Sequence, residues 1–497
     1  MERSAGMLLP LFSLPGPYGI GTLGREAYAF ADFLHAAKQR YWQVLPCGPT
    51  GYGDSPYQSL SGFAGNPYLI DLELLIEDDL LRREEAEELV WGEDPRCIDY
   101  GRLYDHRQRV LSLAKERGWQ RDRESVAEFV RENARWLPDW ALFVACKRHF
   151  GMRSWLDWPD EALRRRQPEA LAYYGRILQE DVECAVYQQY LFDRQWTALR
   201  SYCHARGIQI IGDLPMYVAL DSADVWAEQE WFQLDERGVP TALSGVPPDD
   251  FSADGQLWGN PLYRWDAMQK DGFGWWIRRI GAAARRYDVI RMDHFRGFDA
   301  YWAVPFGATS ARYGRWEPGP GAALIDAWKG WFPRLPVIAE DLGVFSPGVS
   351  ALLQHSGWPG MKVLAFAFSP DGCSSHLPHW HTCGSVCYTG THDNSPLPLW
   401  LREISPEEYE FARRYLGLHG GEGFSWGILR GGMSSVAQLF VAQMQDYLTP
   451  EQAGRINCPG TGSGNWCWRL LPGEASAALA EKIGSMTVRY GRASPMA

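Results

Sequence analysis

The feature that most constrains the fold is a repeated alternation of short apolar strands and amphipathic helices along the 497-residue chain. Residues 25–39, for example, carry apolar side chains at helical spacing and lie between two apolar runs. The run 208–218 is continuously apolar, as strands are when both faces of a parallel sheet are covered. We expect strands at 7–12, 41–46, 208–218, 288–294, 336–341, 361–368 and 385–393, and one within 437–448.

Eight strands alternating with helices predict an α/β fold of the (β/α)8 TIM-barrel type. A doubly wound dinucleotide-binding sheet is disfavoured, because no glycine-rich turn follows the first strand. A barrel of this kind takes ~250 residues or more and tolerates insertions, so we expect one catalytic barrel over 1–497. The insertions are expected at 47–75 (loop-rich, at the active-site mouth), 76–184 (mostly helical) and 219–264 (a loop-rich lid).

Composition narrows the class of partner. The formal net charge of -12 argues against nucleic acid, which requires a basic surface. No stretch approaches the ~20 apolar residues of a membrane helix, and the apolar run at the N-terminus is short and interrupted by Pro10. This run is too short for a secretory leader. Ten scattered cysteines in a chain expected to have no such leader predict a cytoplasmic protein with free thiols. The 24 Trp and 23 Tyr fit sugar binding, since aromatic faces stack on sugar rings, but they fit core packing equally well.

Acidic residues stand at or near the ends of four of the expected strands. They are Asp213, Asp293, Glu340 and Asp393. Functional groups of a barrel gather where its strands end. A single acid at such a place commonly caps a turn. Four are expected to converge on one mouth, where like charges push their pKa values apart.

Arg291 and Asp293 are two residues apart on one strand and therefore point to the same side of the sheet. A guanidinium beside a carboxylate keeps it ionised, as a nucleophile requires, whereas a neighbouring carboxyl with a raised pKa can hold a proton and act as an acid. An ionised carboxylate and an acid ~5–5.5 Å apart are the equipment of a retaining glycosidase. The strand pattern alone leaves open which of the four acids play these parts.

A second cluster of polar residues lies between 373 and 387. It contains His376, His379 and His381 together with Cys373, Cys383 and Cys387. Their spacing matches no zinc pattern, and the chain has no phosphate loop, nucleophile elbow, haem or iron–sulfur spacing. We therefore expect neither a metal nor a cofactor.

Long motifs in the chain resemble the 4-α-glucanotransferases known as amylomaltases or disproportionating enzymes, glycoside hydrolase family 77, which are relatives of the α-amylase clan. The resemblance covers almost the whole length. Its motifs are LLPLFSLPGPYGIGTLG (8–24), WQVLPCGPTGYGDSPYQSLSGFAGNPYLID (42–71), GDLPMYVALDSADVW (212–226), GVPPDDFSADGQLWGNPLY (245–263), RMDHFRGFDAYWAVP (291–305), AEDLG (339–343), PGMKVLAFAF (359–368) and YTGTHDN (388–394).

The resemblance implies a reaction and a set of roles. Segments of α-1,4-glucan are expected to pass between maltooligosaccharides or amylose and 4-hydroxyl acceptors, with cyclic glucans as a further product class. Asp293 is implied as the nucleophile, Glu340 as the general acid and then base, and Asp393 as the residue that stabilises the transition state. Implied substrate-binding residues are Tyr57, Asp213, Asp249, Gln256, Trp258, Arg291, His294, His392 and Asn465. A monomer or weak homo-oligomer that takes part in cytoplasmic maltodextrin or glycogen metabolism is expected.

One segment departs from the family pattern. After THDN the family usually continues with an acid or amide and then Gly-Trp, whereas this chain has Ser395-Pro396-Leu397-Pro398. Two prolines change the course of such a loop, which bears on chain-length preference. Three alternatives stay open: an α-glucan hydrolase with the same acids, a catalytically idle glucan-binding protein, and a phosphate-binding aldolase. The last requires a Schiff-base lysine on a strand, and none of the expected strands offers a convincing one.

Overall fold

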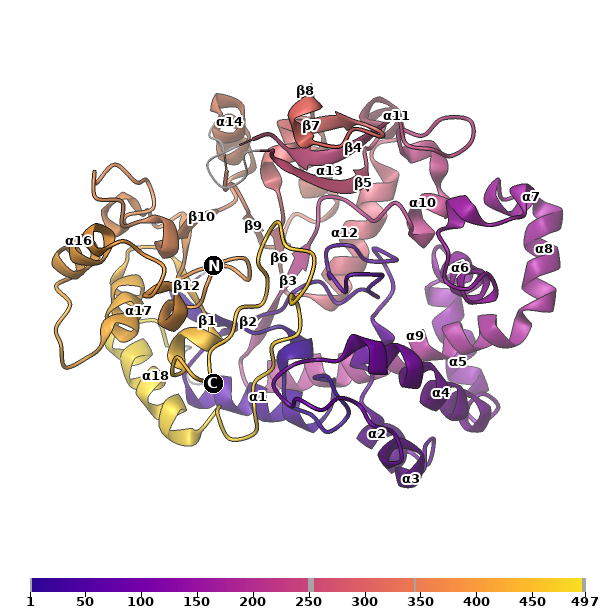
Figure 1. Cartoon of the computed structure of the whole chain (residues 1–497), viewed down its shortest axis with the longest axis horizontal. Helices are drawn as coiled ribbons and strands as arrows, with labels where there is room; N and C mark the ends of the chain where they lie inside the picture. Colours follow the sequence, from indigo (N-terminus) through magenta and orange to yellow (C-terminus); the bar gives the residue numbers. More distant parts are fainter. Residues whose placement is uncertain (1, 249–253, 344–345, 494–497) are drawn as a thin grey trace.

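Eight parallel strands close into a barrel at the centre of the molecule (Figure 1). The computed structural model describes residues 2–248, 254–343 and 346–493. The strand order around the barrel is β1-β12-β11-β10-β9-β6-β3-β2. The strands are β1 Ser4–Leu8, β2 Tyr41–Gln43, β3 Gln209–Leu214, β6 Val289–Met292, β9 Val337–Ala339, β10 Gly360–Val363, β11 Ser385–Tyr388 and β12 Leu439–Gln443. Each overlaps or adjoins an expected strand, and the prediction of a TIM barrel is confirmed.

The inside of the barrel is packed by alternate residues of its strands. Ile211, Val289 and Ile338 belong to one buried cluster with their counterparts on the other strands. Side chains along a strand alternate between its two faces, so the residues two positions further on continue the same inner face. Those residues are Asp213, Arg291 and Glu340. The apolar interior therefore ends in a charged layer at the carboxyl ends of the strands.

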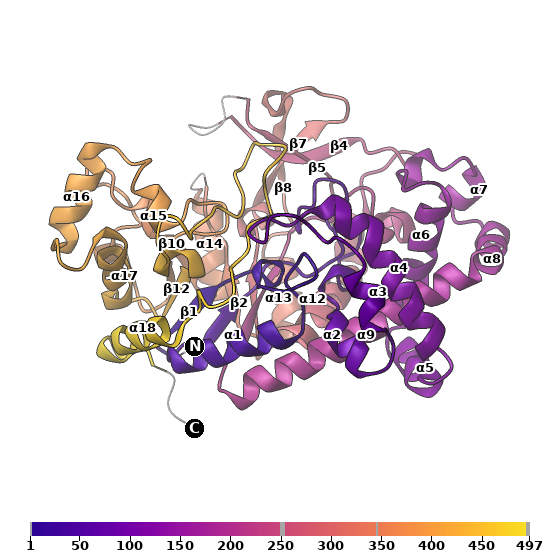
Figure 2. The same cartoon turned by 60° about the horizontal axis from the view of Figure 1, so that its bottom comes forward.

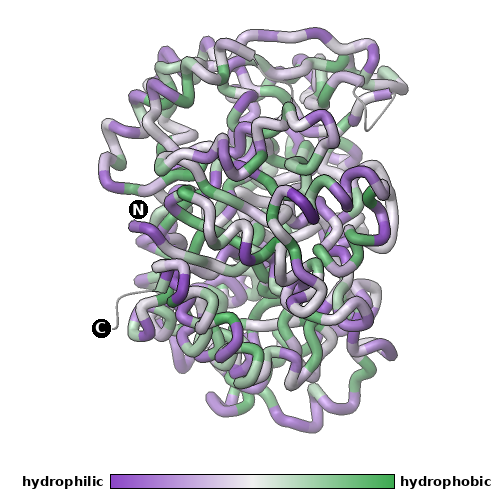
Figure 3. Tube along the Cα trace, turned by 90° about the vertical axis from the view of Figure 1, so that its left-hand side faces the viewer, coloured by the Kyte–Doolittle hydropathy of each residue, from purple (hydrophilic) through white to green (hydrophobic). Residues whose placement is uncertain are grey.

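Helices cover the outside of the barrel. The helices between or after the barrel strands include α1 Arg25–Ala36, α9 Gln179–Ala205, α11 Trp265–Lys270, α12 Gly274–Arg286, α13 Ala322–Trp331, α14 Pro347–Ser356, α15 Leu397–Trp400, α16 Pro406–Leu416, α17 Phe424–Ser434 and α18 Ala477–Arg489. Between β10 and β11, where every residue is described, only short 3-10 turns occur. In Figure 3 apolar stretches cross the middle of the molecule, and many polar stretches lie on the outer turns.

A helical group lies to one side of the barrel, drawn in purple and magenta in Figure 1. It consists of α2 Leu72–Glu77, α3 Arg83–Glu87, α4 Tyr100–Gly118, α5 Arg123–Glu132, α6 Leu137–His149, α7 Glu161–Arg164 and α8 Pro168–Ile177. The long helix α9 joins this group to the barrel, because it packs against α4, α5, α6 and α8 and also against β3.

The interval 219–264, expected to be loop-rich, contains regular structure. It holds α10 Ala223–Ala227 and the strands β4 Ala242–Val246 and β5 Gln256–Pro261. These join β7 Ala300–Pro305 and β8 Arg315–Pro318 in an antiparallel sheet of order β5-β4-β7-β8 above the barrel (Figure 2). The strands carry Gly and Pro and lack a clean alternation of apolar residues. β4 pairs with β7 some 60 residues away, so the local pattern did not reveal this sheet.

Candidate active site

The charged layer at the mouth of the barrel is centred on one buried arginine. Arg291, with 4% of its side chain exposed, donates from Nη1 to both carboxylate oxygens of Asp213 at 2.8 and 2.7 Å. The same nitrogen lies 2.9 Å from Oδ1 of Asp293. Asp213 and Arg291 are direct partners in the register of β3 and β6. The contact between Arg291 and Asp293 agrees with the prediction that they share one side of the sheet.

The carboxyl group of Glu340 has a different environment. It is buried at the end of β9, and each oxygen accepts a backbone N–H, from His294 at 2.8 Å and from Leu342 at 2.9 Å. Burial raises the pKa of Glu340 to about 7, an effect that the charge of Asp293 reinforces and that Arg291 and the two N–H groups oppose. This carboxyl can therefore hold a proton near neutral pH.

His294 adopts a backbone conformation that serves Glu340. Its φ of 51° lies in the left-handed region, which costs energy for a residue with a Cβ. The turn directs the His294 N–H at Glu340. The ring stands edge-on to Trp258, with 4.8 Å between centroids. Burial lowers the pKa of His294 to about 4, so the ring is neutral at physiological pH.

Asp393 reaches the site from the turn that follows β11. Its Oδ1 accepts a hydrogen bond from Nδ2 of Asn457 at 2.6 Å and lies 3.3 Å from Nε2 of His392. The ring of Tyr57 stacks on that of His392, with centroids 4.9 Å apart, and the Tyr57 hydroxyl donates to Asp213 at 2.7 Å. Asp213, Asp293 and Asp393 are thus connected through Arg291, Tyr57 and His392. Glu340 is held separately, by the backbone N–H groups of His294 and Leu342.

These side chains border a cleft of about 2570 Å³. Sites for small ligands are commonly ~300–1,000 Å³, so this cleft has room for a chain of several sugar rings. The expected residues that line it are Tyr57, Gln256, Trp258, Arg291, Asp293, His294, Glu340, His392, Asp393 and Asn465. Asp213 lies beneath the wall, in contact with Arg291 and Tyr57, and Asp249 lies outside the described residues.

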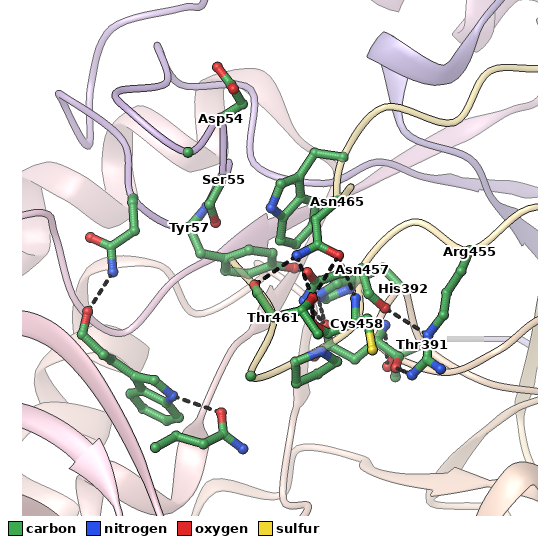
Figure 4. Close-up of a pocket in the computed structure, with 18 of the residues that line it drawn as sticks. Asp54, Ser55, Tyr57, Thr391, His392, Arg455, Asn457, Cys458, Thr461 and Asn465 are labelled. Atoms are coloured by element: carbon green, nitrogen blue, oxygen red, sulfur yellow. Dashed lines mark hydrogen bonds and ion pairs between the residues drawn. The ribbon is translucent and has the colours of Figure 1, made fainter. Parts of the chain in front are cut away.

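Asn465 and Trp258, two of the expected substrate-binding residues, form side-chain hydrogen bonds to residues close to them in the chain. Among the described residues, the Asn465 side chain bonds within its own loop, to Thr461 and to the backbone N–H of Cys458, so it shapes the loop at the rim (Figure 4). Trp258 donates from its ring nitrogen to the Gln256 side chain at 3.2 Å, which fixes the angle at which the indole faces the cleft.

Several polar residues of the site were not predicted. Arg455 and Asn457 contact the turn that carries Asp393. Gln58, in a loop, and Asn260, in strand β5, exchange two amide hydrogen bonds of 3.2 and 3.1 Å. Gln58 and Asn260 fall inside family-like motifs, which is a signal that could have drawn attention to them. Arg455 lies in a segment with no such motif.

The histidines of the segment 373–387 serve separate structural contacts. His376 accepts the Val363 N–H at 3.1 Å, and His381 bonds to Ser435 and to the carbonyl of His376. His379 bonds to the Tyr415 hydroxyl. Within 2–248, 254–343 and 346–493, no three or more His, Cys, Asp or Glu side chains form a group that could hold a metal ion. None of the helices in these ranges is both long and apolar enough to cross a bilayer.

A closed parallel barrel whose strand ends bring three acids into one aromatic-walled cleft defines an enzyme that acts on glycosides. Residues 9–474 match the family described as 4-alpha-glucanotransferase. The chain belongs to this family, which confirms the resemblance found in the sequence, and its activity is the transfer of α-glucan segments.

Individual relatives agree over nearly the full length. The 4-alpha-glucanotransferase of Thermus thermophilus is 48% identical, with 98% of each chain covered. That of Clostridium butyricum is 44% identical, with 97% of this chain and 99% of the relative covered. A solved amylomaltase from Streptococcus agalactiae in complex with acarbose superposes with a TM-score of 0.97 at 40% identity, covering 99% of this chain and 100% of that one.

Proposed function

We propose that the protein transfers α-1,4-glucan segments by a retaining double displacement through a β-glucosyl-enzyme on Asp293. In the first step the Asp293 carboxylate attacks C1 of the donor sugar. The bond from C1 to the glycosidic oxygen breaks, and that oxygen takes a proton from Glu340. In the second step the 4-hydroxyl of an acceptor attacks C1, its proton passes to Glu340, and the carboxylate of Asp293 is released.

The observation that carries this proposal is the contrast between the two carboxyl groups. Asp293 lies 2.9 Å from the Arg291 guanidinium, which orients the carboxylate that is to attack C1. Glu340 is buried, with a pKa raised to about 7, which suits a group that must give and then take a proton at neutral pH. Two carboxyls in such different environments can divide the roles of nucleophile and proton donor.

Asp393 completes the proposed machinery. About 45% of its side chain is exposed toward the cleft, and one oxygen is held by Asn457. We assign Asp393 the role of binding the hydroxyls of the reacting ring, because hydrogen bonds to these hydroxyls strengthen as the sugar approaches an oxocarbenium ion. Tyr57 and His392 form one face of the same subsite, and Gln256, Trp258 and His294 form the acceptor side.

Transfer in place of hydrolysis requires that a sugar hydroxyl be oriented and that water be kept out. Orientation can contribute about 7–11 kcal/mol in favourable cases. The loop 47–71 and strand β5 are joined in the wall of the cleft, because Gln58 donates to the Trp258 carbonyl at 3.0 Å and exchanges amide bonds with Asn260. A wall fixed in this manner favours an acceptor that stacks on it over a mobile water molecule.

A chromatographic product profile from maltotriose tests the proposal. Transfer yields glucose together with chains longer than maltotriose, and Asp293→Asn is expected to abolish both while glucan binding persists. A product mixture of glucose and maltose, without chains longer than maltotriose, would show that the same acids catalyse hydrolysis instead. Normal activity in Asp293→Asn would contradict the assignment of the nucleophile.

We also propose the cytoplasm as the compartment and a monomer or weak homo-oligomer as the assembly. All ten cysteines are unpaired, five of them buried, which suits a reducing environment. Cell fractionation and sedimentation velocity test the two statements. A stable oligomer at micromolar concentration would contradict the second.

A further inference from the structure

The three proposed catalytic acids are not held equally well by the barrel. Asp293 and Glu340 follow β6 and β9 immediately, and each is fixed by groups of the barrel itself. Asp393 lies five residues beyond the end of β11, in a turn, with almost half of its side chain exposed. Its position must therefore be set by something outside the barrel wall.

The loop between β12 and α18 supplies that support. Nδ2 of Asn457 donates to Oδ1 of Asp393 at 2.6 Å, and the backbone N–H of Asn457 donates to the His392 carbonyl at 3.1 Å. One residue of the loop thus contacts both the carboxylate and the backbone of the His392-Asp393 turn. Figure 4 shows Asn457 beside His392 at the edge of the cleft.

Arg455 links the loop that carries Asn457 to the turn that carries Asp393. Its guanidinium donates from Nη2 to the Asp393 carbonyl at 2.8 Å and from Nε to the Asn457 carbonyl at 2.9 Å. Nη1 donates to Oγ of Ser395 at 3.0 Å. Three donors in a rigid plane thus fix three acceptors, a pattern that the single ammonium of lysine cannot reproduce. In Figure 4 the Arg455 side chain lies to the right of His392 and Thr391, on the side away from Tyr57.

The unusual residue after Asn394 takes part in the same network. Ser395 accepts from Arg455 and donates its own hydroxyl proton to Oε1 of Glu403 at 2.6 Å. The next residues start α15, whose first N–H, from Leu397, binds the buried carboxylate of Asp446 at 2.8 Å. The serine and prolines that depart from the family pattern therefore build a rigid anchor for the turn.

We propose that Arg455 is a positioning residue for glucan transfer, which acts through Asn457 and the Asp393 backbone to hold the Asp393 carboxylate against the reacting sugar. This inference rests on the proposed function of Asp393. Nε, Nη1 and Nη2 of Arg455 each donate to a protein oxygen, so its guanidinium acts on the turn and not on the sugar. Its loss leaves the acids chemically intact but lets the Asp393 turn move, and a displacement of ~1 Å in a catalytic group can cost about 10²-fold in rate.

The test compares steady-state maltotriose disproportionation in Arg455→Ala, Arg455→Lys and Asn457→Ala. We expect Arg455→Ala to lower kcat about 10²-fold, with KM changed less than about threefold, because Asp393 matters most in the transition state. Arg455→Lys should recover only part of kcat. Asn457→Ala, which removes one amide group, keeps the test decisive should Arg455→Ala unfold.

Arg96→Ala is the matched control. Arg96 tethers the same loop through the Gln452 carbonyl at 3.2 Å and Glu474 at 2.6 Å, but it does not contact the Asp393 turn. The Arg96→Ala substitution should lower the melting temperature and leave kcat unchanged. An equal fall of kcat in Arg96→Ala would overturn the inference, since general loosening of the loop would then explain the effect.

A double-mutant cycle separates this inference from the proposed function. With α-maltosyl fluoride as donor, Arg455→Ala should lower the rate less than about threefold when Asp393 is already Asn, because no carboxylate remains to be positioned. If Asp393→Asn alone keeps wild-type activity, the proposed function fails. If Asp393→Asn is inactive while Arg455→Ala and Asn457→Ala have wild-type kcat, only the positioning role is overturned.

Discussion

Replacement of Glu340 by Gln should abolish transfer and at the same time change how stability depends on pH. The carboxyl has an ordinary pKa of 4.5, and burial raises it to about 7 in the folded protein. The folded state therefore binds this proton more tightly than the unfolded state. The contribution of this proton to the free energy of unfolding is complete below about pH 4.5 and is lost as the pH rises through about 7. Between about pH 5 and pH 8 the loss amounts to about 2.5 kcal/mol.

A glutamine at this position cannot ionise, so the variant escapes the loss. It carries a constant cost instead, because both oxygens of Glu340 accept backbone N–H groups and an amide can accept only one of them. Such an unpaired donor costs about 1–3 kcal/mol at every pH. The quantity to examine is therefore the difference in the free energy of unfolding between the two proteins, measured as a function of pH. The constant cost cancels when this difference is compared at two pH values.

Thermal melts of the wild type and of Glu340→Gln between about pH 5 and pH 8 provide the assay. With about 2.1 cal/mol/K per residue, a 497-residue chain has an unfolding entropy near 1 kcal/mol/K, so the variant should gain about 2 °C relative to the wild type over this range. Glu85→Gln is the control, because Arg117 lowers the pKa of Glu85 to about 2 and its contribution is nearly flat over the same range. Parallel curves for Glu340→Gln and the wild type would refute the reasoning.

Three further predictions concern activity. The kcat/KM for maltotriose should fall as the pH rises above about 7, because the free enzyme then loses the proton of Glu340; a rate that still rises at pH 9 would contradict this. Arg291→Met should destabilise the protein by about 3–5 kcal/mol and abolish transfer, since it strands the fully buried carboxylate of Asp213; denaturant unfolding and kcat measure the two effects, and unchanged values would refute the role of Arg291. Gln58→Leu should raise the share of glucose released by hydrolysis, because the link to Trp258 and Asn260 is lost; an unchanged product ratio would show that this link does not exclude water.

The barrel could be predicted because its signal is local. Each parallel strand is buried on both faces, so runs such as 208–214 are mostly apolar, with Gln209 and Asp213 as their polar residues, and stand out from the helices around them. The strand-end acids follow from the same pattern, since an inner-face residue such as Arg291 or Glu340 is the polar continuation of an apolar layer. The contact of Arg291 with Asp293 needed only the two-residue period of a strand.

The unpredicted parts depend on contacts between distant segments. β4 pairs with β7, about 60 residues away, and its Gly and Pro content hides the strand. Arg455 is 62 residues from Asp393, and nothing in its own surroundings indicates that its guanidinium faces that turn. The left-handed backbone of His294 is equally invisible in the sequence, because only a few per cent of residues other than glycine adopt positive φ, even though histidine is enriched among them.

The most direct test of the account is to trap the covalent intermediate. In Glu340→Gln, α-maltosyl fluoride should still glycosylate the enzyme, because fluoride leaves without a proton, whereas the second step lacks its base and the intermediate accumulates. Peptide mass spectrometry should then find one maltosyl group on Asp293, and none in the Asp293→Asn, Glu340→Gln double variant. A maltosyl group on another residue, or an adduct that persists without the Asp293 carboxylate, would contradict the central claim.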